Sequence, residues 1–383
     1  MLHYGIISQR FGSLVKLQSA STTRERSVVL SYRVVPALMS AFLIQCAEAA
    51  WLPDAAIRLG MRRLISQRLR QICSGNDQQR AADFLRLVDE LSSGPIARQT
   101  DKANQQHYEV PTEFFRLSLG KHLKYSCCYW EPDTVELDDA EQNALERTCH
   151  NADLHDGQHI LELGCGWGSL SLWMAEHYPN SRILAVSNSS SQKAFIDRQA
   201  RDRNLSNLTV QTCDVNSFDP AFMLDRVVSV EMFEHIRNHR LMMNRIADWL
   251  RPDGRLFVHI FCHRQTPYLF EDEGSTSWMA QQFFSGGMMP SADLLIRCQD
   301  RLVAELQTTW NGRHYKKTAN AWLARMDQRP DAIAGCFRTA CSANWKLQRQ
   351  RWRMFYMACA ELFGFDDGQQ WFVSHYRFRK AQP

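Results

Sequence analysis

Two carboxylates and a histidine, Glu231, Glu234 and His235, stand at positions i, i+3 and i+4 of the segment VEMFEH. If the turn that carries them is helical, the three side chains share one face. Carboxylates can hold an ammonium group and histidine titrates near neutral pH, so this set suits binding an amine and removing its proton. The structural alternative is that the same residues cap the following helix and face solvent.

A glycine-rich run, ILELGCGWG at 160–168, predicts a turn that approaches a ligand closely. An apolar stretch with strand character, which includes Glu162, runs directly into Gly164 and Gly166, and a helical pattern follows over 169–178. Glycines allow a sharp turn and leave room for a ligand beside the backbone. The G-x-G-x-G spacing after an acidic residue resembles the first motif of S-adenosylmethionine-dependent methyltransferases. An ordinary glycine turn of an α/β protein is the alternative.

Polar residues close the next two expected strands. Asn188 ends the strand ILAVSN, and Gln192 follows one turn into the next helix. This strand end meets the ribose hydroxyls in nucleotide-binding folds, and both side chains can hydrogen-bond a diol without adding charge. Asp214 ends the strand LTVQTCD, where it can accept a hydrogen bond from an adenine amino group, and Val215 follows it in the expected cofactor site.

Alternating strands and helices must position these residues. The expected strands are 160–163, 183–188, 208–214, 225–233 and 255–261, the last after the turn signal Pro252-Asp253-Gly254. Such alternation predicts an α/β fold with a parallel sheet and helices on both faces. Ligands bind these sheets at the carboxyl ends of the strands, where the candidate residues fall.

The composition is that of a globular protein, with 383 residues, 45% hydrophobic and 22% charged, and a formal net charge of +4. Twelve cysteines are present without a C-x-x-C pair, so neither a zinc ribbon nor a redox motif is indicated, and no metal site is expected. Free thiols fit a reducing compartment, which predicts a cytoplasmic protein. The sequence contains no run of 18 apolar residues, and no nucleic-acid partner is expected.

The N-terminal region is basic and divides into two parts. Residues 1–35 are interpreted as a leader that we expect to be disordered, with a targeting segment or an upstream start codon as alternatives. A helical module is expected over 36–95, ending at the polar linker 92–106. Within it, 56–72 holds five arginines, no acidic residue and apolar residues at helical spacing. We expect a core-facing helix with a solvated arginine face, and an amphipathic helix on anionic lipid is the alternative.

Several uncommon motifs, in the same order, resemble those of the cyclopropane-fatty-acyl-phospholipid synthase superfamily. They are HYEVPTEFFRLSLGKHLKYSCCYW, the glycine turn, VEMFEH and FVHIFCH. The motifs FFSGGMMPSADLL, HYKKT, AWLARMD and AELFGFDDGQQW are most similar to the coclaurine N-methyltransferase-like branch. The resemblance covers roughly residues 50–380, and the leader departs from it.

This resemblance implies a class I methyltransferase fold, which is a Rossmann-like, seven-stranded, mostly parallel sheet with helices on both faces. It also implies an N-terminal helical extension, a methyltransferase domain over 96–383, and an insertion at about 264–300 that covers the substrate. The implied cofactor is S-adenosyl-L-methionine, and the implied activity is N-methylation of a small aromatic or alkaloid-like amine. A homodimer is compatible with the family, and a membrane surface is the less favoured partner.

The resemblance also implies roles for single residues. Glu234 and His235 become an acid–base pair, and Glu231 becomes a carboxylate that orients the substrate. Tyr125 and Ser126 approach the methionine end of the cofactor.

In the cyclopropane synthases the base is a bicarbonate ion, whose contacts resemble Cys127, Glu234, His259 and Tyr315 here. His259 can equally be a hydrogen-bonded core histidine, and Tyr315 a packing aromatic. These residue types leave lipid chemistry open. Methyl transfer to an unsaturated acyl chain is therefore the first alternative function, and a non-catalytic cofactor-binding scaffold is the second.

Overall fold

The structure is a computed structural model that describes residues 42–97, 111–270, 278–284, 286–298 and 300–381. The expected leader at 1–35 lies outside these residues. From Gln45 onward the chain forms one compact unit by its internal contacts. The rest of this description concerns that unit.

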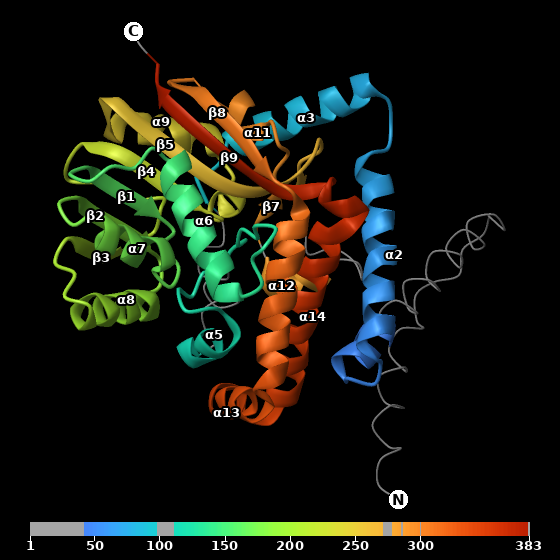
Figure 1. Ribbon diagram of the computed structural model, residues 1–383. Helices are drawn as coiled ribbons and strands as arrows, with labels where there is room; N and C mark the ends of the chain where they lie inside the picture. The colour runs from blue at the N-terminus through green and yellow to red at the C-terminus, as the bar shows by residue number, and fades with distance from the viewer. Residues whose placement is uncertain (1–41, 98–110, 271–277, 285, 299, 382–383) are drawn as a thin grey trace, which may run out of the picture. The chain divides into compact units, whose positions relative to one another are not determined.

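A seven-stranded sheet organises the unit (Figure 1). Its strands are β1 (His159–Leu163), β2 (Arg182–Ser187), β3 (Leu208–Thr212), β4 (Leu224–Val230), β5 (Leu250–His263), β8 (Leu302–Trp310) and β9 (Trp371–Lys380). Their order is β3-β2-β1-β4-β5-β9-β8, and β9 runs antiparallel to both of its neighbours. The expected seven-stranded, mostly parallel α/β fold is confirmed.

The helices precede, connect and follow these strands. They are α2 (Asp54–Ile72), α3 (Asp77–Ser92), α5 (Thr112–Ser118), α6 (Leu137–Asn151), α7 (Ser169–His177), α8 (Ser190–Asp202), α9 (His239–Trp249), α10 (Trp278–Phe283), α11 (Leu294–Arg297), α12 (Gly312–Gln328), α13 (Pro330–Cys341) and α14 (Trp345–Gly364). Short 3₁₀ turns are η1 (Phe233–His235), η2 (Ser342–Asn344) and η3 (Phe365–Gly368), and β6 (Tyr268–Leu269) pairs with β7 (Met288–Met289).

Alternate residues of the buried strands face the two helical layers, because successive side chains of a strand point to opposite faces. In β1, Leu161 packs in a cluster with residues of α9, such as Met242. The neighbouring Ile160 packs in a different cluster with residues of α6 and α7, such as Leu145 and Met174. Helices therefore cover both faces of the sheet, as expected.

Strand bounds differ from the sequence expectation at two places that matter for the site. β4 ends at Val230 rather than at 233, so Glu231 lies in a turn outside the sheet. β5 begins at Leu250 and includes the expected turn 252–254. The β4–β5 register shifts between Leu224 and Arg226, and this irregularity accommodates the proline and glycine within the strand.

The arginine-rich helix α2 packs on α14, and Ile57 and Ile65 are buried. Its core-facing packing is therefore confirmed. Arg58 and Arg62 both donate to Glu361 at 2.9 Å, so these two arginines are ion-paired rather than only solvated. The expected domain boundary between 95 and 96 stays a prediction.

The expected insertion at about 264–300 contains short elements among its described residues, namely β6, α10, β7 and α11. It contacts the turn after β4, because Arg237 donates to the backbone oxygen of Gly286 at 2.8 Å. The insertion therefore adjoins the segment that carries the candidate catalytic residues.

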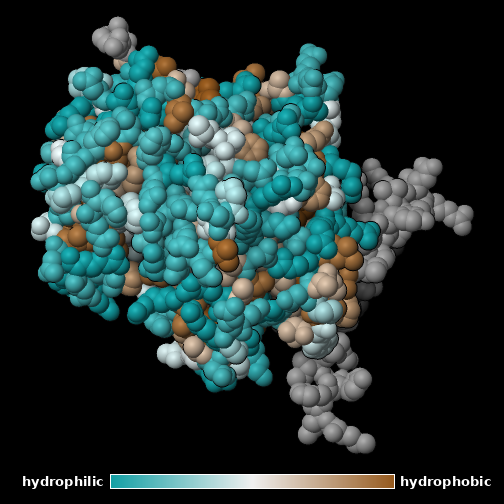
Figure 2. All heavy atoms as spheres, in the orientation of Figure 1, coloured by the Kyte–Doolittle hydropathy of each residue, from teal (hydrophilic) through white to brown (hydrophobic). Residues whose placement is uncertain are grey.

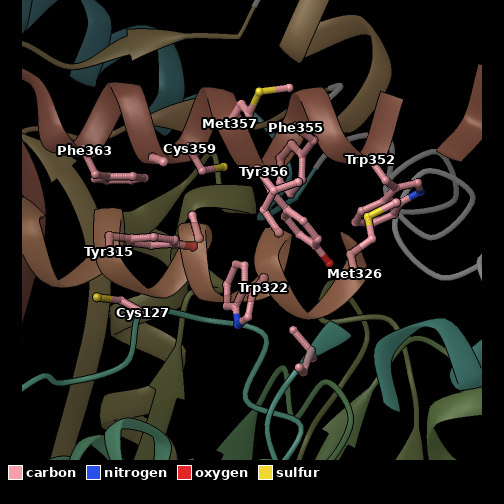
Figure 3. Packing of buried hydrophobic residues seen from close by; sticks show 14 of the residues in the cluster. Cys127, Tyr315, Trp322, Met326, Trp352, Phe355, Tyr356, Met357, Cys359 and Phe363 are labelled. Carbon is pink, nitrogen blue, oxygen red and sulfur yellow. The ribbon is translucent and has the colours of Figure 1, made fainter. Parts of the chain in front are cut away.

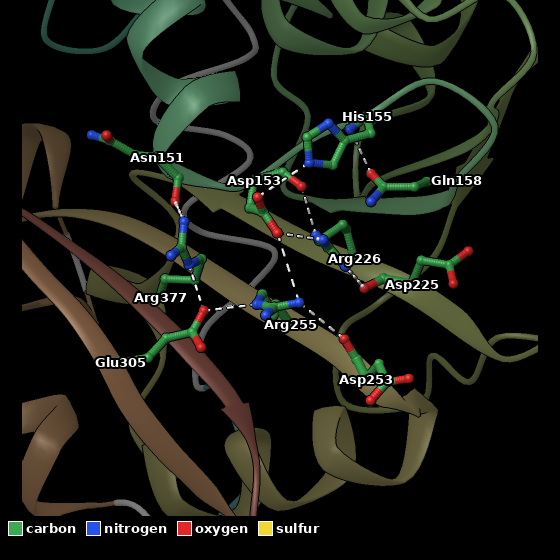
Figure 4. A network of polar contacts seen from close by, with 10 residues as sticks. All are labelled: Asn151, Asp153, His155, Gln158, Asp225, Arg226, Asp253, Arg255, Glu305 and Arg377. Carbon is green, nitrogen blue, oxygen red and sulfur yellow. Dashed lines mark hydrogen bonds and ion pairs between the residues drawn. The ribbon is translucent and has the colours of Figure 1, made fainter.

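A network of ion pairs links the strands at the amino ends of β4 and β5 (Figure 4). Arg226 donates to Asp153 at 2.6 Å, and Arg255 donates to Glu305 at 2.7 Å. Arg377 of β9 pairs with Glu305 and also donates to the backbone oxygen of Asn151 at 3.1 Å. This network fixes the end of α6 against β9.

On the face shown in Figure 2, hydrophilic residues predominate and hydrophobic ones are scattered among them. Among the described residues, no helix is long and apolar enough to cross a membrane.

Candidate active site

The turn after β1 leaves open space where a ligand can approach. Gly164 and Gly166 have φ angles of 78° and 51°, which residues with a side chain rarely adopt. A Cβ on Gly164 would lie 2.6 Å from Met232, whereas a Cβ on Gly166 would meet no described heavy atom within 4 Å. The backbone at Gly166 therefore borders space that a cofactor can fill.

Gln192, in the first turn of α8, supplies a buried hydrogen-bond donor at the end of β2. Its Oε1 accepts the Ser187 hydroxyl at 2.6 Å. Its Nε2 is buried and has no hydrogen-bond partner among the described residues. Buried polar groups are almost always paired, and a ribose hydroxyl would satisfy this donor. The residues present thus fit the nucleoside part of S-adenosylmethionine.

The other expected nucleoside contacts also lie at strand ends. Asn188 directly follows β2 and is half-buried. Asp214 follows β3, and its Oδ1 accepts the backbone N–H of Asn216 at 2.7 Å, which fixes the carboxylate. Val215 packs partly buried against the core. Their contact with a cofactor stays a prediction.

Glu162, in β1, is a buried carboxyl that accepts the hydroxyl of Ser171. Burial raises its pKa to about 7, an effect that Ser171 and the Lys124 ammonium oppose. Its charge therefore responds to a cation placed nearby, and a cofactor amino group is such a cation.

Glu231 contacts three of the four residues that we expected around a bicarbonate ion, namely Cys127, His259 and Tyr315. Its Oε1 accepts the backbone N–H of Cys127 at 2.8 Å and lies 3.2 Å from Nε2 of His259. Its Oε2 accepts the hydroxyl of Tyr315 at 2.7 Å. The resemblance had placed Glu234 in this group, and the structure places Glu231 at its centre instead. His259 and Tyr315 are therefore more than packing residues.

A left-handed backbone turn brings Glu231 into this position, with a φ of 48°. The expected helical face does not form, because only Phe233–His235 is helical, as one 3₁₀ turn. The left-handed turn nevertheless leaves Glu231 close enough to Glu234 and His235 for its charge to act on both.

Glu234 is buried and only half satisfied. Its Oε1 accepts the backbone N–H of Phe261 at 2.7 Å. Its Oε2 is buried and has no hydrogen-bond partner in the described part of the chain. Burial, and then the neighbouring charge of Glu231, raises the pKa of Glu234 well above its ordinary value. A carboxyl in this state is ready to interact with a donor from a ligand.

His235 lies parallel to the ring of Phe284, with the ring centroids 6.3 Å apart and an interplanar angle of 20°. Burial lowers its pKa to about 4, although the Glu231 charge acts in the opposite direction. Our expectation that His235 titrates near neutral pH is therefore wrong for the ligand-free protein. His235 is neutral there, because its charged form would lose its hydration.

A buried lysine that the sequence did not single out lies next to Ser126. The Nζ of Lys124 donates to the Ser126 hydroxyl and to the backbone oxygen of Cys127, both at 2.6 Å. The ammonium also lowers the pKa of Glu231, against the larger effect of burial that raises it. Tyr125, which lies between Lys124 and Ser126 in the sequence, packs edge-on against Phe115.

Glu141 of α6 is a second residue that the sequence did not reveal. Its carboxylate accepts the backbone N–H groups of Gly120, His122 and Lys124 at 2.9, 2.7 and 3.2 Å. These contacts span about twenty residues, so no local pattern could have indicated them. Glu141 thereby holds the segment that leads to Ser126 and Cys127.

Aromatic rings from α12 and α14 enclose this region (Figure 3). Tyr315 stacks on Phe363, with centroids 4.1 Å apart and planes within 4°. Phe355 stacks on Phe283 of the insertion at 4.3 Å. Cys359 is buried on α14, and burial raises the pKa of its thiol. The surroundings suit a planar ligand, and Cys359 remains a neutral packing thiol.

Comparisons with known proteins place the chain in a family. The model of the family described as mycolic acid cyclopropane synthetase matches residues 97–370. The (S)-coclaurine N-methyltransferase of Thalictrum flavum subsp. glaucum is 35% identical over 343 residues, which cover 88% of this chain and 95% of that protein. The cyclopropane-fatty-acyl-phospholipid synthase of Escherichia coli K12 is 28% identical over 275 residues, 70% of this chain and 66% of that protein.

A solved structure supports the same placement. The crystal structure of coclaurine N-methyltransferase bound to N-methylheliamine and SAH has a TM-score of 0.85 and 33% sequence identity, and covers 88% of this chain and 99% of that chain. The resemblance and the class I methyltransferase fold expected from the sequence are thereby confirmed. The chain belongs to the mycolic acid cyclopropane synthetase family of S-adenosylmethionine-dependent methyltransferases.

Proposed function

We propose that this protein N-methylates a small aromatic or alkaloid-like amine. The relatives named coclaurine N-methyltransferase support this activity. The observation that carries it is the state of the two carboxyls. Glu231 already accepts the donors of Cys127, His259 and Tyr315, and Glu234 keeps one buried oxygen for a ligand.

When bound, S-adenosylmethionine supplies the methyl group as an activated electrophile. The chain's own residues must orient the amine and take its proton. In this proposal Glu231 faces the ammonium form of the substrate and orients it. The free Oε2 of Glu234 accepts the proton, which leaves the amine nitrogen with a lone pair for the transfer.

The pKa shifts favour Glu234 over His235 as the proton acceptor. An alkylammonium group has a pKa of about 10, by analogy with lysine, so a carboxyl with a raised pKa accepts its proton more readily. The pKa of Glu234 is raised by burial and by Glu231, whereas that of His235 is lowered to about 4. We therefore assign proton transfer to Glu234, and His235 stays neutral.

The two carboxyls act as a pair because each disfavours ionisation of the other. Such a pair loses its protons in two steps and carries a single negative charge over a range of pH. A bound ammonium group favours the second ionisation, because it adds a positive charge beside the pair. Substrate binding and activation of the base are thus coupled.

Cofactor binding is proposed for the residues expected from the sequence. They are Tyr125, Ser126, Glu162, Gly164, Gly166, Asn188, Gln192, Asp214 and Val215. Tyr125 and Ser126 face the methionine end, and the residues after β2 and β3 face the nucleoside. We add Lys124 to this set, because its ammonium donates to Ser126 and suits a carboxylate.

Lipid methylation is less well supported. In that chemistry a bicarbonate ion would need the donors of Cys127, His259 and Tyr315, and here Glu231 accepts all three.

The proposal also includes a cytoplasmic enzyme that does not need a membrane surface, with a helical module over 36–95 before the methyltransferase domain. A homodimer is part of it and can be checked by light scattering.

Incubation with methyl-labelled cofactor and two substrate pools tests the proposal. One pool contains aromatic secondary amines and the other contains phospholipids with unsaturated acyl chains. Label should enter the amines and be absent from the phospholipids. Label in the phospholipid pool alone would overturn the proposed function.

A further inference from the structure

A line of hydrogen-bonded side chains runs from the partly buried Asn151, at the end of α6, through two buried histidines to Glu231. The Nδ2 of Asn151 lies 2.9 Å from Nδ1 of His375 on β9. The Nε2 of His375 lies 2.9 Å from Nδ1 of His259 on β5. The Nε2 of His259 lies 3.2 Å from Oε1 of Glu231. The two histidines are opposite each other in the β5–β9 ladder.

The direction of every hydrogen bond in this line is fixed by its two ends. An amide nitrogen can only donate, so Nδ1 of His375 must accept and its proton must sit on Nε2. That N–H then donates to Nδ1 of His259, whose own proton must sit on Nε2. The second N–H donates to the carboxylate of Glu231. One asparagine thus sets the tautomer of both imidazoles.

The surroundings hold both imidazoles in this state. His259 and His375 are 0% exposed, and Trp310 packs against both rings at 5.1 and 4.3 Å. Burial lowers the pKa of each well below its ordinary value, and the Lys124 ammonium acts in the same direction. Glu231 is the acidic group in contact with the line, at its His259 end. At the other end the Arg377 guanidinium donates to the backbone oxygen of Asn151, and Nδ1 of His150 lies 3.4 Å from Oδ1 of Asn151. Both rings therefore stay neutral donors over the physiological pH range.

Asn151 itself is held in place. The backbone oxygen of Asn151 accepts a hydrogen bond from Arg377, which also pairs with Glu305 (Figure 4). Arg377 lies two residues beyond His375 on β9, so the same strand presents the histidine and fixes its partner. The arrangement has no evident need in packing alone, because an apolar side chain could fill a buried position in a strand.

We infer that Asn151 and His375 are positioning residues that act through His259 to keep an N–H pointed at Glu231. This inference rests on the proposed role of Glu231 as the carboxylate that orients the amine. A fixed N–H donor, together with Tyr315 and Cys127, holds the carboxylate in one orientation. In the other tautomer, Nε2 of His259 would present a lone pair to Glu231, and the lone pair would repel the carboxylate.

Replacing Asn151 by Asp reverses the line without removing a side chain. A carboxylate only accepts, so Nδ1 of His375 must carry the proton and donate to it. Nε2 of His375 then becomes an acceptor, Nδ1 of His259 becomes the donor to it, and Nε2 of His259 no longer presents an N–H to Glu231. We expect N151D to lower kcat/KM for an accepted amine at least tenfold, chiefly through KM. The change should alter the pH profile, because His259 beside Glu231 now gains a proton more easily.

Asn143→Asp is the matched control. It makes the same change on the same helix, and its partner, the Thr134 hydroxyl at 3.0 Å, can rotate to donate to a carboxylate. N143D should stay within twofold of the unmodified enzyme. Equal kcat/KM and equal pH profiles for N151D and N143D would overturn the inference.

His375→Gln and His375→Leu form a second pair. Glutamine retains an N–H that can reach His259, whereas leucine removes it, so H375Q should keep several-fold more kcat/KM than H375L. If H375L does not fold, N151D and H375Q still decide the matter. Equal activity of folded H375Q and H375L would contradict a positioning role.

Nitrogen-15 spectra of histidine-labelled protein give a readout that does not depend on methyl transfer. In the unmodified protein, His259 and His375 should both show a protonated Nε2 and a bare Nδ1 at pH 7. In N151D, His375 should show a protonated Nδ1. If the labelled cofactor methylates no amine, the proposed function fails, and these spectra still decide whether the line exists. An unchanged His375 tautomer in N151D would overturn it.

Discussion

Tyr315 donates its hydroxyl to Oε2 of Glu231 at 2.7 Å, across 84 positions of sequence. Burial and the Glu231 charge raise the pKa of Tyr315 well above its ordinary value, so the phenol stays protonated and remains a donor. Its ring stacks on Phe363 independently of the hydroxyl. The hydroxyl can therefore be removed with little change in packing.

Tyr315→Phe should raise the KM for the amine and lower kcat/KM by roughly tenfold or more, because a hydrogen bond to a charged group contributes about 1.5–3 kcal/mol. Steady-state kinetics on an accepted amine measure this. Tyr356→Phe is the control, since Tyr356 is also buried and its hydroxyl lies 3.2 Å from that of Ser118. Equal losses in the two variants would argue against a specific role.

Glu234→Gln should lower kcat by about 10²–10⁴, the usual contribution of a positioned proton acceptor. The raised pKa of Glu234 means that the unmodified enzyme gains its base as pH rises through that pKa. The variant has no such group, so its deficit should grow as pH rises through the pKa of Glu234. The deficit should shrink only at still higher pH, where more of the amine is already neutral. The pH profile of kcat/KM decides, and a pH-independent deficit would indicate a structural role.

His235→Ala should have a smaller effect than Glu234→Gln. With a pKa near 4, His235 is neutral at working pH and is not the main proton acceptor. Cofactor affinity, measured by calorimetry, should change little in either variant. A larger loss of kcat in His235→Ala than in Glu234→Gln would reverse this order of importance.

Gly166→Val should abolish cofactor binding in calorimetry, because the side chain would enter the open space above the turn. Gly157→Val is a matched control. Gly157 also has a positive φ, of 87°, and a Cβ there also meets no described atom within 4 Å, but it precedes β1 at the opposite end. Both variants should lose stability from strain, and only Gly166→Val should lose the cofactor. If folded Gly166→Val keeps its affinity for the cofactor, the cofactor does not bind at this turn.

Glu231→Gly should slow the reaction and make it responsive to bicarbonate. Glycine tolerates the φ of 48° at this position. Removing the carboxylate frees the donors of Cys127, His259 and Tyr315, which can then bind a small planar oxyanion. Bicarbonate should restore part of the rate, and chloride should not. No difference between the two anions would mean that the donors do not form an anion site.

Much of this could be predicted from the sequence where the signal is local. The apolar run, the glycines and the helical pattern at 160–178 gave the first strand, turn and helix within one or two residues, because each is specified by its neighbours. The end of β4 could not be placed, since VEMF is apolar enough to continue a strand. Only the contacts of Glu231 with distant segments stabilise its left-handed turn.

The pKa values of the site residues could not be predicted from the sequence either. The residue types at 231, 234 and 235 indicated a proton-transfer group, but the pKa of His235 depends on burial that only packing produces. Lys124 and His375 have no recognisable spacing in the sequence relative to the turn that carries Glu231. Their roles arise because β9 and the segment before α6 converge on it in space.

β9 has a consequence for how the protein is made. It inserts between β5 and β8, and it supplies His375 to the line that ends at Glu231. The ribosome must translate residue 375 and its neighbours before β5 can gain its second partner. The glycine turn and the first four strands precede β8 and β9 in the chain, so they can meet during synthesis. A nascent chain arrested after β8 would leave the edge of β5 unpaired, a surface on which chaperones and aggregation compete.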